Sequence, residues 1–445
     1  MQFDKDLQAK QEARDLCKQA ELAQKELFFF PQEKLDAIVA AIAKAFEVAA
    51  AELAQMAVEE TGFGNVKDKI IKNQFASRRV LEAIAPMKTV GILKETQGLW
   101  EVGVPVGVIA AIVPSTNPTS TVCYKAMIAL KSGNAILFSP HPKALSCTLR
   151  AAQIVARAAE AAGAPKGSVS CLTIPSLDGC RELMGAEPVR LILATGGPAM
   201  VKAAYSSGKP AIGVGAGNGP AYLHPSCDLQ DALEKILESK TFDNGTVCAS
   251  EQSIIVEAQM EERVKELAQS MGYYFMDAQE AKALGALLFR PNGALNPEIV
   301  GKSAQVLAEK AGFRVPQSTK ILVAREQDAG KKYLYSHEKL CPVLGWFVAQ
   351  DEEAAMKLAI KVLSYEGAGH TFSIHAKDMD VVRRFCRCVP VSRFLVNAPA
   401  AQGGIGATTK LFPALTLGCG AVGGSSSSNN ISPLDLVNIR KVAWG

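Results

Sequence analysis

The chain has 445 residues, of which 48% are hydrophobic and 21% are charged, and its formal net charge is only +4. This length exceeds one ordinary hydrophobic core, so we expect two or three domains. The composition excludes wholesale disorder, and the small charge without any basic tract argues against nucleic acid as a partner.

The first half of the chain predicts helices and then an alternation of strands and helices. Helix-forming residues dominate 4–26 and 31–60, and 89–104 predict two strands joined at a Gln-Gly turn. We then expect strands at 107–113, 135–138, 168–174 and 188–194, and helices at 121–131 and 145–162. This alternation is typical of βαβ units, whose parallel sheet is covered by helices on both faces.

The pattern restarts after Gly217, with a strand at 221–223 and a helix that begins at Asp228, a good N-cap residue. Further alternation runs to about residue 412. A Gly/Ser/Asn-rich stretch at 423–430 then leads into an apolar segment at 431–442. Because an apolar segment needs a partner, we interpret the C-terminus as an arm.

Cysteine use and the lack of long apolar runs indicate the compartment. The first residues lack the apolar stretch of a secretory signal, and no apolar run is long enough for a membrane span. Eleven scattered cysteines fit a reducing compartment, so we expect a cytoplasmic protein without membrane contact. Cys386 and Cys388 form a C-x-C pair without a second pair, and the five histidines show no metal spacing, so we expect no metal.

Cys248 lies in a predicted turn between a helix and the apolar strand 253–256, just after the turn dipeptide Asn244-Gly245. A thiol at such a turn can be exposed and surrounded by backbone N–H groups, which favour a thiolate and can stabilise an oxyanion. Alternatively, Cys248 is one of eleven cysteines and packs as a small apolar residue. The local sequence leaves both interpretations open.

Two glycine-rich runs invite a nucleotide-binding interpretation. The run at 213–220 precedes a strand and does not open a helix, so it does not fit the dinucleotide fingerprint. Residues 191–202 predict a strand, a glycine turn and a helix with Pro198 in its first turn. A helix N-terminus at the carboxyl end of a parallel strand is a natural anion site, although a tight turn without a ligand is the alternative.

The order of these segments resembles the aldehyde dehydrogenase superfamily, and in particular its CoA-acylating acetaldehyde dehydrogenase branch. The resemblance covers essentially the whole chain. It rests on residues 112–119, 138–142, 194–198, 204–210, 213–220, the Cys248 turn, 338–343, 369–371, 401–406 and 415–420. It ends where bifunctional aldehyde–alcohol dehydrogenases add an iron-dependent alcohol dehydrogenase, so we expect a stand-alone enzyme without that second activity.

The resemblance implies roles for the matching positions. Cys248 corresponds to the nucleophile, Asn117 to the amide of the oxyanion hole, and Glu338 to the carboxylate that holds the nicotinamide ribose. The other implied cofactor-binding positions are Pro114, Ser139, His141, Thr195, Gly196, Gly197 and Gly215. The alternatives are a helix cap before Pro118 for Asn117 and an exposed loop charge for Glu338, and we discount both because independent segments converge on one reaction.

One departure from the wider superfamily bears on the mechanism. Hydrolytic members carry a glutamate before their glycine pair, whereas residues 213–219 contain no carboxylate. Without this base, attack by water on a thioester is slow, and the resemblance implies the CoA thiol as the acceptor. His370 matches a loop near the active site and is a candidate for proton transfer from CoA; a packing or capping histidine is the equal alternative.

We therefore expect an α/β, aldehyde dehydrogenase-like fold with two Rossmann-like parallel-sheet domains. The NAD-binding domain covers 1–88 and 105–227, the catalytic domain covers 228–412, and 89–104 and 413–445 are oligomerisation segments that pair with another subunit. A homodimer or dimer of dimers is the expected assembly, with association with a bacterial microcompartment left open.

The expected reaction oxidises a small aldehyde with NAD+ and CoA to its acyl-CoA, reversibly. NAD is favoured over NADP because neither Ser139 nor His141 supplies a fixed cation for a 2′-phosphate. Acetaldehyde is the default substrate, with propionaldehyde, butyraldehyde and sulfoacetaldehyde open. The alternatives are a hydrolytic enzyme that releases the free acid, a semialdehyde dehydrogenase with another acceptor such as phosphate, and a catalytically silent scaffold.

Overall fold

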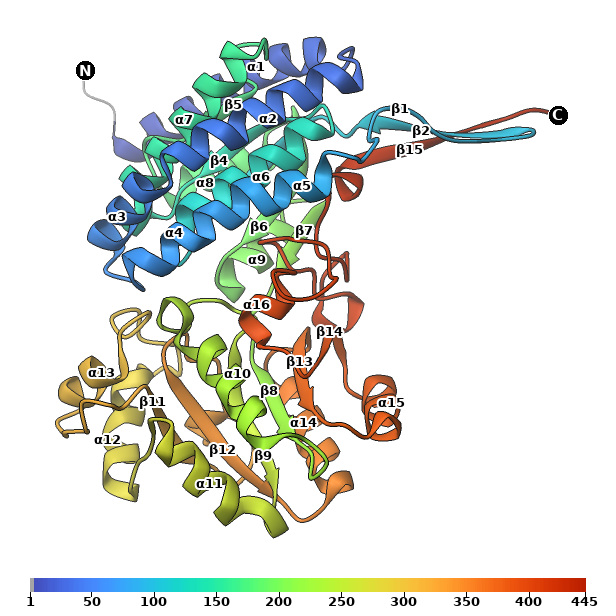
Figure 1. Cartoon of the computed structure of the whole chain (residues 1–445). Helices are drawn as coiled ribbons and strands as arrows, with labels where there is room; N and C mark the ends of the chain where they lie inside the picture. The colour runs from blue at the N-terminus through green and yellow to red at the C-terminus, as the bar shows by residue number, and fades with distance from the viewer. Residues whose placement is uncertain (1–3) are drawn as a thin grey trace.

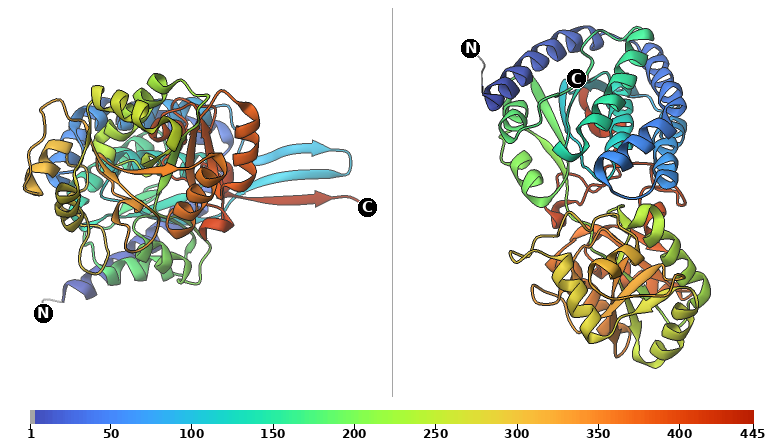
Figure 2. Two further views of the ribbon diagram at one scale, coloured as in Figure 1. Left: turned by 90° about the horizontal axis from the view of Figure 1, so that it is seen from below. Right: turned by 90° about the vertical axis from the view of Figure 1, so that its left-hand side faces the viewer.

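The computed structural model describes residues 4–445 and contains two α/β bodies and one projecting arm (Figure 1). Each body is built on a parallel sheet, and the arm is a separate antiparallel sheet. The left view in Figure 2 shows the arm extending away from the rest of the molecule. The predicted α/β class with two parallel sheets is confirmed.

The first body holds a five-stranded sheet in the order β5-β4-β3-β6-β7, with all neighbours parallel. Its strands are β3 (Val108–Ile112), β4 (Ala135–Ser139), β5 (Val169–Cys171), β6 (Val189–Thr195) and β7 (Ala211–Val214). The chain places β4 and β5 on one side of β3 and then returns to place β6 and β7 on the other side, so the order of the strands reverses between β3 and β6. This is the kind of switch point at which open α/β sheets bind ligands, at the carboxyl ends of the strands.

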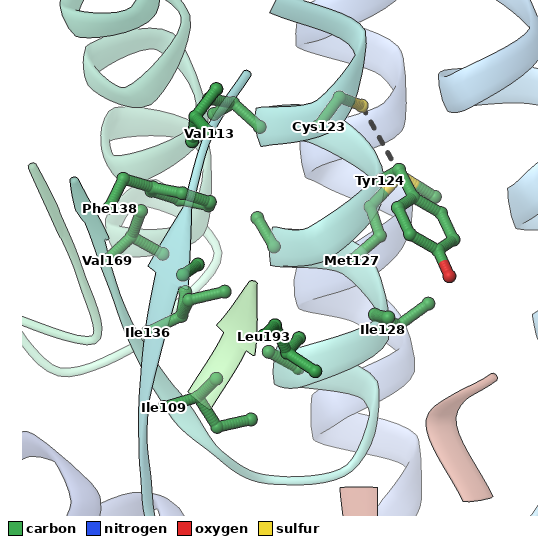
Figure 3. Packing of buried hydrophobic residues seen from close by; sticks show 14 of the residues in the cluster. Ile109, Val113, Cys123, Tyr124, Met127, Ile128, Ile136, Phe138, Val169 and Leu193 are labelled. Atoms are coloured by element: carbon green, nitrogen blue, oxygen red, sulfur yellow. Dashed lines mark hydrogen bonds between the residues drawn. The ribbon is translucent and has the colours of Figure 1, made fainter. Parts of the chain in front are cut away.

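Helices enclose this sheet. They are α1 (Lys5–Leu27), α2 (Gln32–Val48), α3 (Ala50–Thr61), α4 (Val66–Gln74), α5 (Val80–Ile84), α6 (Pro118–Lys131), α7 (Leu145–Ala161), α8 (Leu177–Gly185) and α9 (Pro198–Tyr205), with a π-helical turn at Phe75–Arg79. Every residue of α6 is buried, because the sheet covers one side and α2 packs on the other. Figure 3 shows Ile109 and Leu193 of the strands on one side of α6, and Met127 and Ile128 of the helix pointing to its other side.

The second body holds a seven-stranded parallel sheet in the order β10-β11-β12-β9-β8-β13-β14. Its strands are β8 (Gly219–Leu223), β9 (Glu251–Glu257), β10 (Tyr273–Phe275), β11 (Ile321–Arg325), β12 (Val343–Ala349), β13 (Gly369–His375) and β14 (Val391–Val396). Its helices are α10 (Leu229–Thr241), α11 (Glu261–Ser270), α12 (Ala278–Leu288), α13 (Ala304–Lys310), α14 (Glu352–Tyr365), α15 (Met379–Cys388) and α16 (Ala400–Gly404).

Neighbouring residues of one strand serve the two faces of this second sheet. Trp346 joins the buried cluster that includes Leu233 of α10, whereas Phe347 joins the cluster that includes Val362 of α14. Because successive strand residues point to opposite faces, helices must cover both sides of the sheet. Asp228 caps α10 through a hydrogen bond from the Asp231 N–H, as its sequence predicts.

The change from one sheet to the other occurs between β7 and β8, at residues 215–218. It therefore comes before the predicted boundary at 227/228, because β8 pairs with β9 and β13 of the second sheet. Four elements of the first body, α4, α5, α8 and β7, have no counterpart among the predicted elements. Strand β7 is only four residues long and runs straight into the glycine-rich stretch, which obscures its pattern.

The arm is formed by β1 (Gly91–Thr96), β2 (Leu99–Pro105) and β15 (Val437–Ala443). The predicted hairpin is present, and β15 pairs antiparallel with β2 of the same chain. The expected pairing of these segments with another subunit stays a prediction. Before β15, Leu417 and Ile431 are buried in the core of the first body, so much of 413–445 is packed and not extended.

Candidate active site

A cavity of about 420 Å³ lies where the two sheets approach each other. The first sheet contributes the loops that follow β3, β4 and β6, at the carboxyl ends of these strands. The second sheet contributes Cys248, just before β9, and Glu338, just before β12. The cavity brings together the predicted residues Pro114, Asn117, His141, Thr195, Gly196, Gly197, Gly215, Cys248 and Glu338. Ser139 and His370 do not line it.

Cys248 is half-buried in the segment between the turn at Phe242–Gly245 and β9. Burial raises the pKa of its thiol to about 12, and the nearby carboxylate of Glu338 adds to this shift. Both effects oppose the thiolate that this turn is expected to favour. The weak opposing effect comes from Arg393, a buried cation on β14.

Asn117 occupies the N-cap position of α6, yet its side chain makes no capping hydrogen bond. Its Oδ1 instead accepts a hydrogen bond of 2.6 Å from Lys72 Nζ. Its Nδ2 has only long contacts, 3.2 Å to Thr116 Oγ1 and 3.5 Å to the Thr246 carbonyl oxygen. The amide N–H group is therefore only weakly engaged by protein groups, in a cavity that Cys248 also lines.

Glu338 is partly buried, in contrast to the exposed loop charge that its sequence also allows. Its Oε1 accepts a hydrogen bond of 2.8 Å from the Gly217 N–H. Burial and the neighbouring Glu366 raise the pKa of Glu338 to about 8. Among residues 4–445, Glu338 is the only carboxylate in the cavity wall.

The glycine run at 213–219 approaches Cys248 so closely that its composition follows from packing. A Cβ atom at Gly217 would lie 1.8 Å from the Cys248 carbonyl oxygen. At Gly215, by contrast, a Cβ would have nothing within 4 Å. The run therefore serves as a close-packed support for the cysteine on one side and an open cavity wall on the other.

The turn after β6 has the features of a ligand-binding turn. Gly197 forms the N-cap of α9 without any side-chain cap, and Pro198 occupies the first helical turn as predicted. Thr195 Oγ1 is buried and has no hydrogen-bond partner. An orphaned hydroxyl next to an uncapped helix N-terminus leaves donors for an anionic or hydroxyl-rich ligand.

The region after β4 differs from expectation at Ser139. This residue is buried at the end of β4 and lies outside the cavity wall. His141 lines the cavity, and its Nδ1 accepts a hydrogen bond of 3.1 Å from the Lys143 N–H. The side chain of Lys143, a residue that the motif does not single out, also lines the cavity.

His370 lies within β13 and is fully buried. Its Nδ1 is 2.9 Å from Thr371 Oγ1, and its Nε2 has no partner. Burial, with a contribution from Arg393, lowers its pKa well below the usual value, so the imidazole is neutral. The structure thus places His370 behind the cavity wall and not in it.

Several residues of the wall are not apparent from sequence motifs. Val247, Ile405 and Leu417 belong to one buried apolar cluster, and Cys248 and Leu415 pack against it. Lys72 lines the same cavity from α4. Only the strong N-cap signal of Asn65, which begins α4 and accepts from the Asp68 N–H, could have drawn attention to that helix.

The described residues offer neither a cluster of metal ligands nor a helix that could span a membrane. No group of three or more His, Cys, Asp or Glu side chains that could hold a metal ion occurs within residues 4–445. In the same part of the chain, the helices are all too short or too polar to cross a membrane.

Two parallel sheets covered by helices enclose a cavity that contains one cysteine, one side-chain amide and one carboxylate. This arrangement is that of an α/β enzyme whose site lies at the edges of its sheets. The profile described as "Aldehyde dehydrogenase family" matches residues 5–310. Because this match covers more than half of the chain, the protein belongs to the aldehyde dehydrogenase family.

Curated relatives support the acylating branch of the family. The bifunctional aldehyde-alcohol dehydrogenase of Escherichia coli (strain K12) is 46% identical over 439 residues, which is 97% of this chain and 49% of the relative. This chain therefore spans about half the length of the relatives of that type. The succinate-semialdehyde dehydrogenase (acetylating) of Clostridium kluyveri is 36% identical, with 97% of this chain and 95% of the relative covered.

Solved structures agree with this placement. An acetylating aldehyde dehydrogenase from Geobacillus thermoglucosidasius has a TM-score of 0.97 and 48% identity, with 100% of this chain and 98% of that chain covered. A propionaldehyde dehydrogenase from Rhodopseudomonas palustris with bound propionyl-CoA has a TM-score of 0.89 and 28% identity, covering 97% and 94%. One from a Clostridium phytofermentans fucose utilisation microcompartment has a TM-score of 0.87 and 29% identity, covering 96% of each chain.

Proposed function

We propose that this protein oxidises a small uncharged aldehyde to its acyl-CoA with NAD+ and CoA, in a reversible reaction that passes through a thioester on Cys248. The observation that carries the proposal is the single cavity in which Cys248, Asn117 and Glu338 meet. Three segments distant in sequence supply the nucleophile, an amide donor and a carboxylate. A catalytically silent scaffold would not require this combination.

The residues present fit a nicotinamide cofactor. The orphaned Thr195 Oγ1 and the uncapped N-terminus of α9 offer donors, and Gly215 leaves open space in the wall. In the proposal Thr195, Gly196, Gly197, Pro114, His141 and Gly215 form the cofactor wall, and Glu338 binds the nicotinamide ribose. When bound, the cofactor supplies the hydride acceptor. The first body is then the NAD-binding domain and the second the catalytic domain.

The chain's own residues perform the acyl chemistry. Cys248 Sγ loses its proton to solvent and adds to the aldehyde carbon, and the carbonyl oxygen becomes an oxyanion that Asn117 Nδ2 stabilises. Loss of a hydride from this carbon leaves a thioester on Cys248. The CoA thiolate then attacks the acyl carbon, the bond to Cys248 Sγ breaks, and acyl-CoA and the free cysteine are released.

The wall favours CoA over water as the acceptor. Hydrolysis needs a base that activates water, and Glu338 is the only carboxylate in the described wall. Gly217, where a side chain would collide with the Cys248 carbonyl, leaves no room for another acid at that point of the run. The Oε1 atom of Glu338 already accepts a hydrogen bond from the Gly217 N–H.

The apolar residues beside Cys248 support a small uncharged aldehyde. Val247, Ile405, Leu415 and Leu417 surround this end of the cavity with aliphatic side chains. A carboxylate or sulfonate there would lose its hydration without gaining a cation, because the Lys72 ammonium is already engaged by protein groups. Acetaldehyde and propionaldehyde fit these walls better than succinate semialdehyde or sulfoacetaldehyde.

NAD remains the expected cofactor. Lys143 adds a cation near His141, and its effect on the use of NADP can be tested.

We further propose assembly as a homodimer or dimer of dimers through the arm, whose Ile439, Val442 and Trp444 are exposed apolar residues. A cytoplasmic location is expected. The buried Ala13 and Cys17 of α1 belong to the core of the first body, so the side of the helix that carries them packs against its own domain.

The test is NADH formation from a panel of acetaldehyde, propionaldehyde, butyraldehyde, succinate semialdehyde and sulfoacetaldehyde, with and without CoA. We expect strict dependence on CoA, a preference for the uncharged aldehydes and loss of activity in Cys248→Ala. Turnover without CoA would indicate the hydrolytic alternative, and phosphate-dependent turnover the other acceptor. The absence of any turnover would support the scaffold.

A further inference from the structure

Helix α4 carries two lysines into the interior beside the cavity. The side chains of Lys69 and Lys72 are each 3% exposed, and both contact Asp243, which is 0% exposed. The distances from their Nζ atoms to Asp243 Oδ2 are 2.9 Å and 2.6 Å. Burying three charged groups is unfavourable unless their hydrogen bonds are complete, so this cluster requires an explanation.

The hydrogen bonds of Lys72 are complete. Its ammonium donates to Asp243 Oδ2 at 2.6 Å, to Asn117 Oδ1 at 2.6 Å and to Thr246 Oγ1 at 2.9 Å. An ammonium has three protons, and these contacts use all of them. Lys72 lines the cavity, but it therefore has no proton left for a substrate.

The contact with Lys72 determines which way the Asn117 amide faces. A side-chain amide has one accepting oxygen and one donating NH₂ group. Because Lys72 can only donate, it must be met by Oδ1, and Nδ2 is left on the opposite side. Reversal of the amide would place two donor groups against each other and leave the buried ammonium short of one acceptor.

Asp243 anchors the arrangement to the segment that leads into Cys248. Its backbone is left-handed, with φ of 50°, and its N–H donates to Asp68 Oδ2 at 2.7 Å. Its Oδ1 accepts from the Asn65 N–H at 2.9 Å, and Thr246 Oγ1 donates to Oδ2 at 2.7 Å. Gly64 leaves room for this carboxylate, since a Cβ there would lie 1.8 Å from Asp243 Oδ1.

We propose that Lys72, held by Asp243, is a positioning residue that orients the Asn117 amide so that Nδ2 faces the oxyanion formed at Cys248. This inference rests on the proposed function in one respect, because it assumes that an acyl group is formed on Cys248. The two lysines are balanced by the carboxylates of Asp68 and Asp243 around them, so the effect is one of orientation and not of net charge.

The cluster offers a matched control. Lys69 has the same charge, the same burial and the same carboxylate partner, but its other contact is with the Thr116 carbonyl oxygen and not with Asn117. Lys72→Met and Lys69→Met therefore each remove one buried ammonium from Asp243. Only the first removes the group that orients the amide.

Acylation of Cys248 is measured with p-nitrophenyl acetate, whose acetyl transfer forms an oxyanion without aldehyde, NAD or CoA. We expect N117A to slow acylation by roughly 100-fold or more, K72M by roughly 10- to 100-fold and K69M by roughly threefold or less. K72M added to N117A should cost less than about threefold further, because Lys72 acts through Asn117. Multiplied losses in the double variant, or equal losses in K69M and K72M, would overturn the inference.

Two further measurements keep the outcomes separate. Thermal unfolding reports whether each variant folds. Should K72M not fold, Lys72→Gln replaces it; its amide still donates to Asn117 Oδ1, so acylation within about threefold of the wild type is then expected, and a loss of tenfold or more would overturn the inference. NADH formation from acetaldehyde and CoA is measured in parallel. Failure of the wild type in this second assay, with normal acylation by the ester, contradicts the proposed reaction but leaves the Lys72 cycle readable.

Discussion

The two walls of the cavity are built in opposite ways. The wall formed by the turns after β4, β6 and β7 consists of backbone turns, with Thr195 Oγ1 unpartnered and open space at Gly215. The wall around Asn117 and Cys248 is supported by buried charges, in which every proton of Lys72 has an acceptor. The first wall is left to be completed by a ligand, whereas the second is organised before any ligand arrives.

This difference matches what each wall must do. A cofactor that binds and leaves can supply the missing hydrogen-bond partners itself. An oxyanion exists only briefly, so the donors that stabilise it must already be in place. The comparison predicts that changes in the first wall alter binding, and that changes in the second alter the rate.

The largest effect is expected for Cys248→Ala. Loss of the nucleophile should lower CoA-dependent turnover by about 10⁴-fold or more, since no other route to the acyl intermediate exists. The affinity for NAD should change little, because the turn after β6 does not depend on the thiol. Turnover and cofactor fluorescence titrations check both halves. A large loss of cofactor affinity would show that the two walls are not independent.

Glycine replacements in one loop compare the walls directly. Gly217→Ala places a methyl group 1.8 Å from the Cys248 carbonyl oxygen, so we expect destabilisation on the order of 1–3 kcal/mol and a displaced cysteine. Gly215→Ala meets no atom within 4 Å and should leave the free energy of unfolding unchanged while raising KM for the cofactor. Chemical denaturation and steady-state kinetics of both variants test this. Equal stabilities would refute the assignment of Gly217 as a support.

The raised pKa values predict how Cys248 reactivity depends on pH. With a thiol pKa of about 12, the thiolate fraction and the rate of alkylation by iodoacetamide should rise about tenfold per pH unit from 7 to 10. Glu338 ionises near pH 8, and its negative charge then opposes the thiolate. Glu338→Gln should therefore speed alkylation several-fold above pH 8 and have no effect at pH 6.

The readout must be specific to one cysteine, because Cys386 and Cys388 are exposed. Mass spectrometry of the Cys248 peptide provides it, with the Cys386 peptide as an internal control. A flat pH profile for Cys248 would mean that its thiolate is already formed at neutral pH.

The sequence predicted the elements that have a local signal. The apolar runs of β3, β4 and β6 and the capping residue Asp228 are short-range features, and the structure confirms them. Cys248, Asn117 and Glu338 were found because a family resemblance supplied their combination. Lys72 carries no such signal, since it lies 45 residues from Asn117 and 171 residues from Asp243 along the chain. Only the packing of α4 against the turn before Cys248 reveals its contacts.

The thiol and His370 show a second limit of the sequence. Both residues are chemically suitable for catalysis, but their protonation depends on burial, which residue identity does not disclose. In the fold, burial raises the pKa of Cys248 and lowers that of His370. Lys143 shows the opposite: in the sequence it is an ordinary lysine, and only the fold shows that the loop after β4 places it in the cavity wall.

Lys143 provides the smallest expected effect and the finest test of the first wall. Lys143 is exposed, so a contact with a 2′-phosphate would be screened by solvent and worth little. Lys143→Ala should lower kcat/KM for NADP by roughly two- to fivefold and leave that for NAD unchanged. Lys357→Ala, which removes an exposed lysine of α14 outside the cavity wall, is the matched control. An equal loss with NAD and NADP would mean that Lys143 contacts a part common to both cofactors, and the NAD preference would then have to come from the shape of the turn after β6.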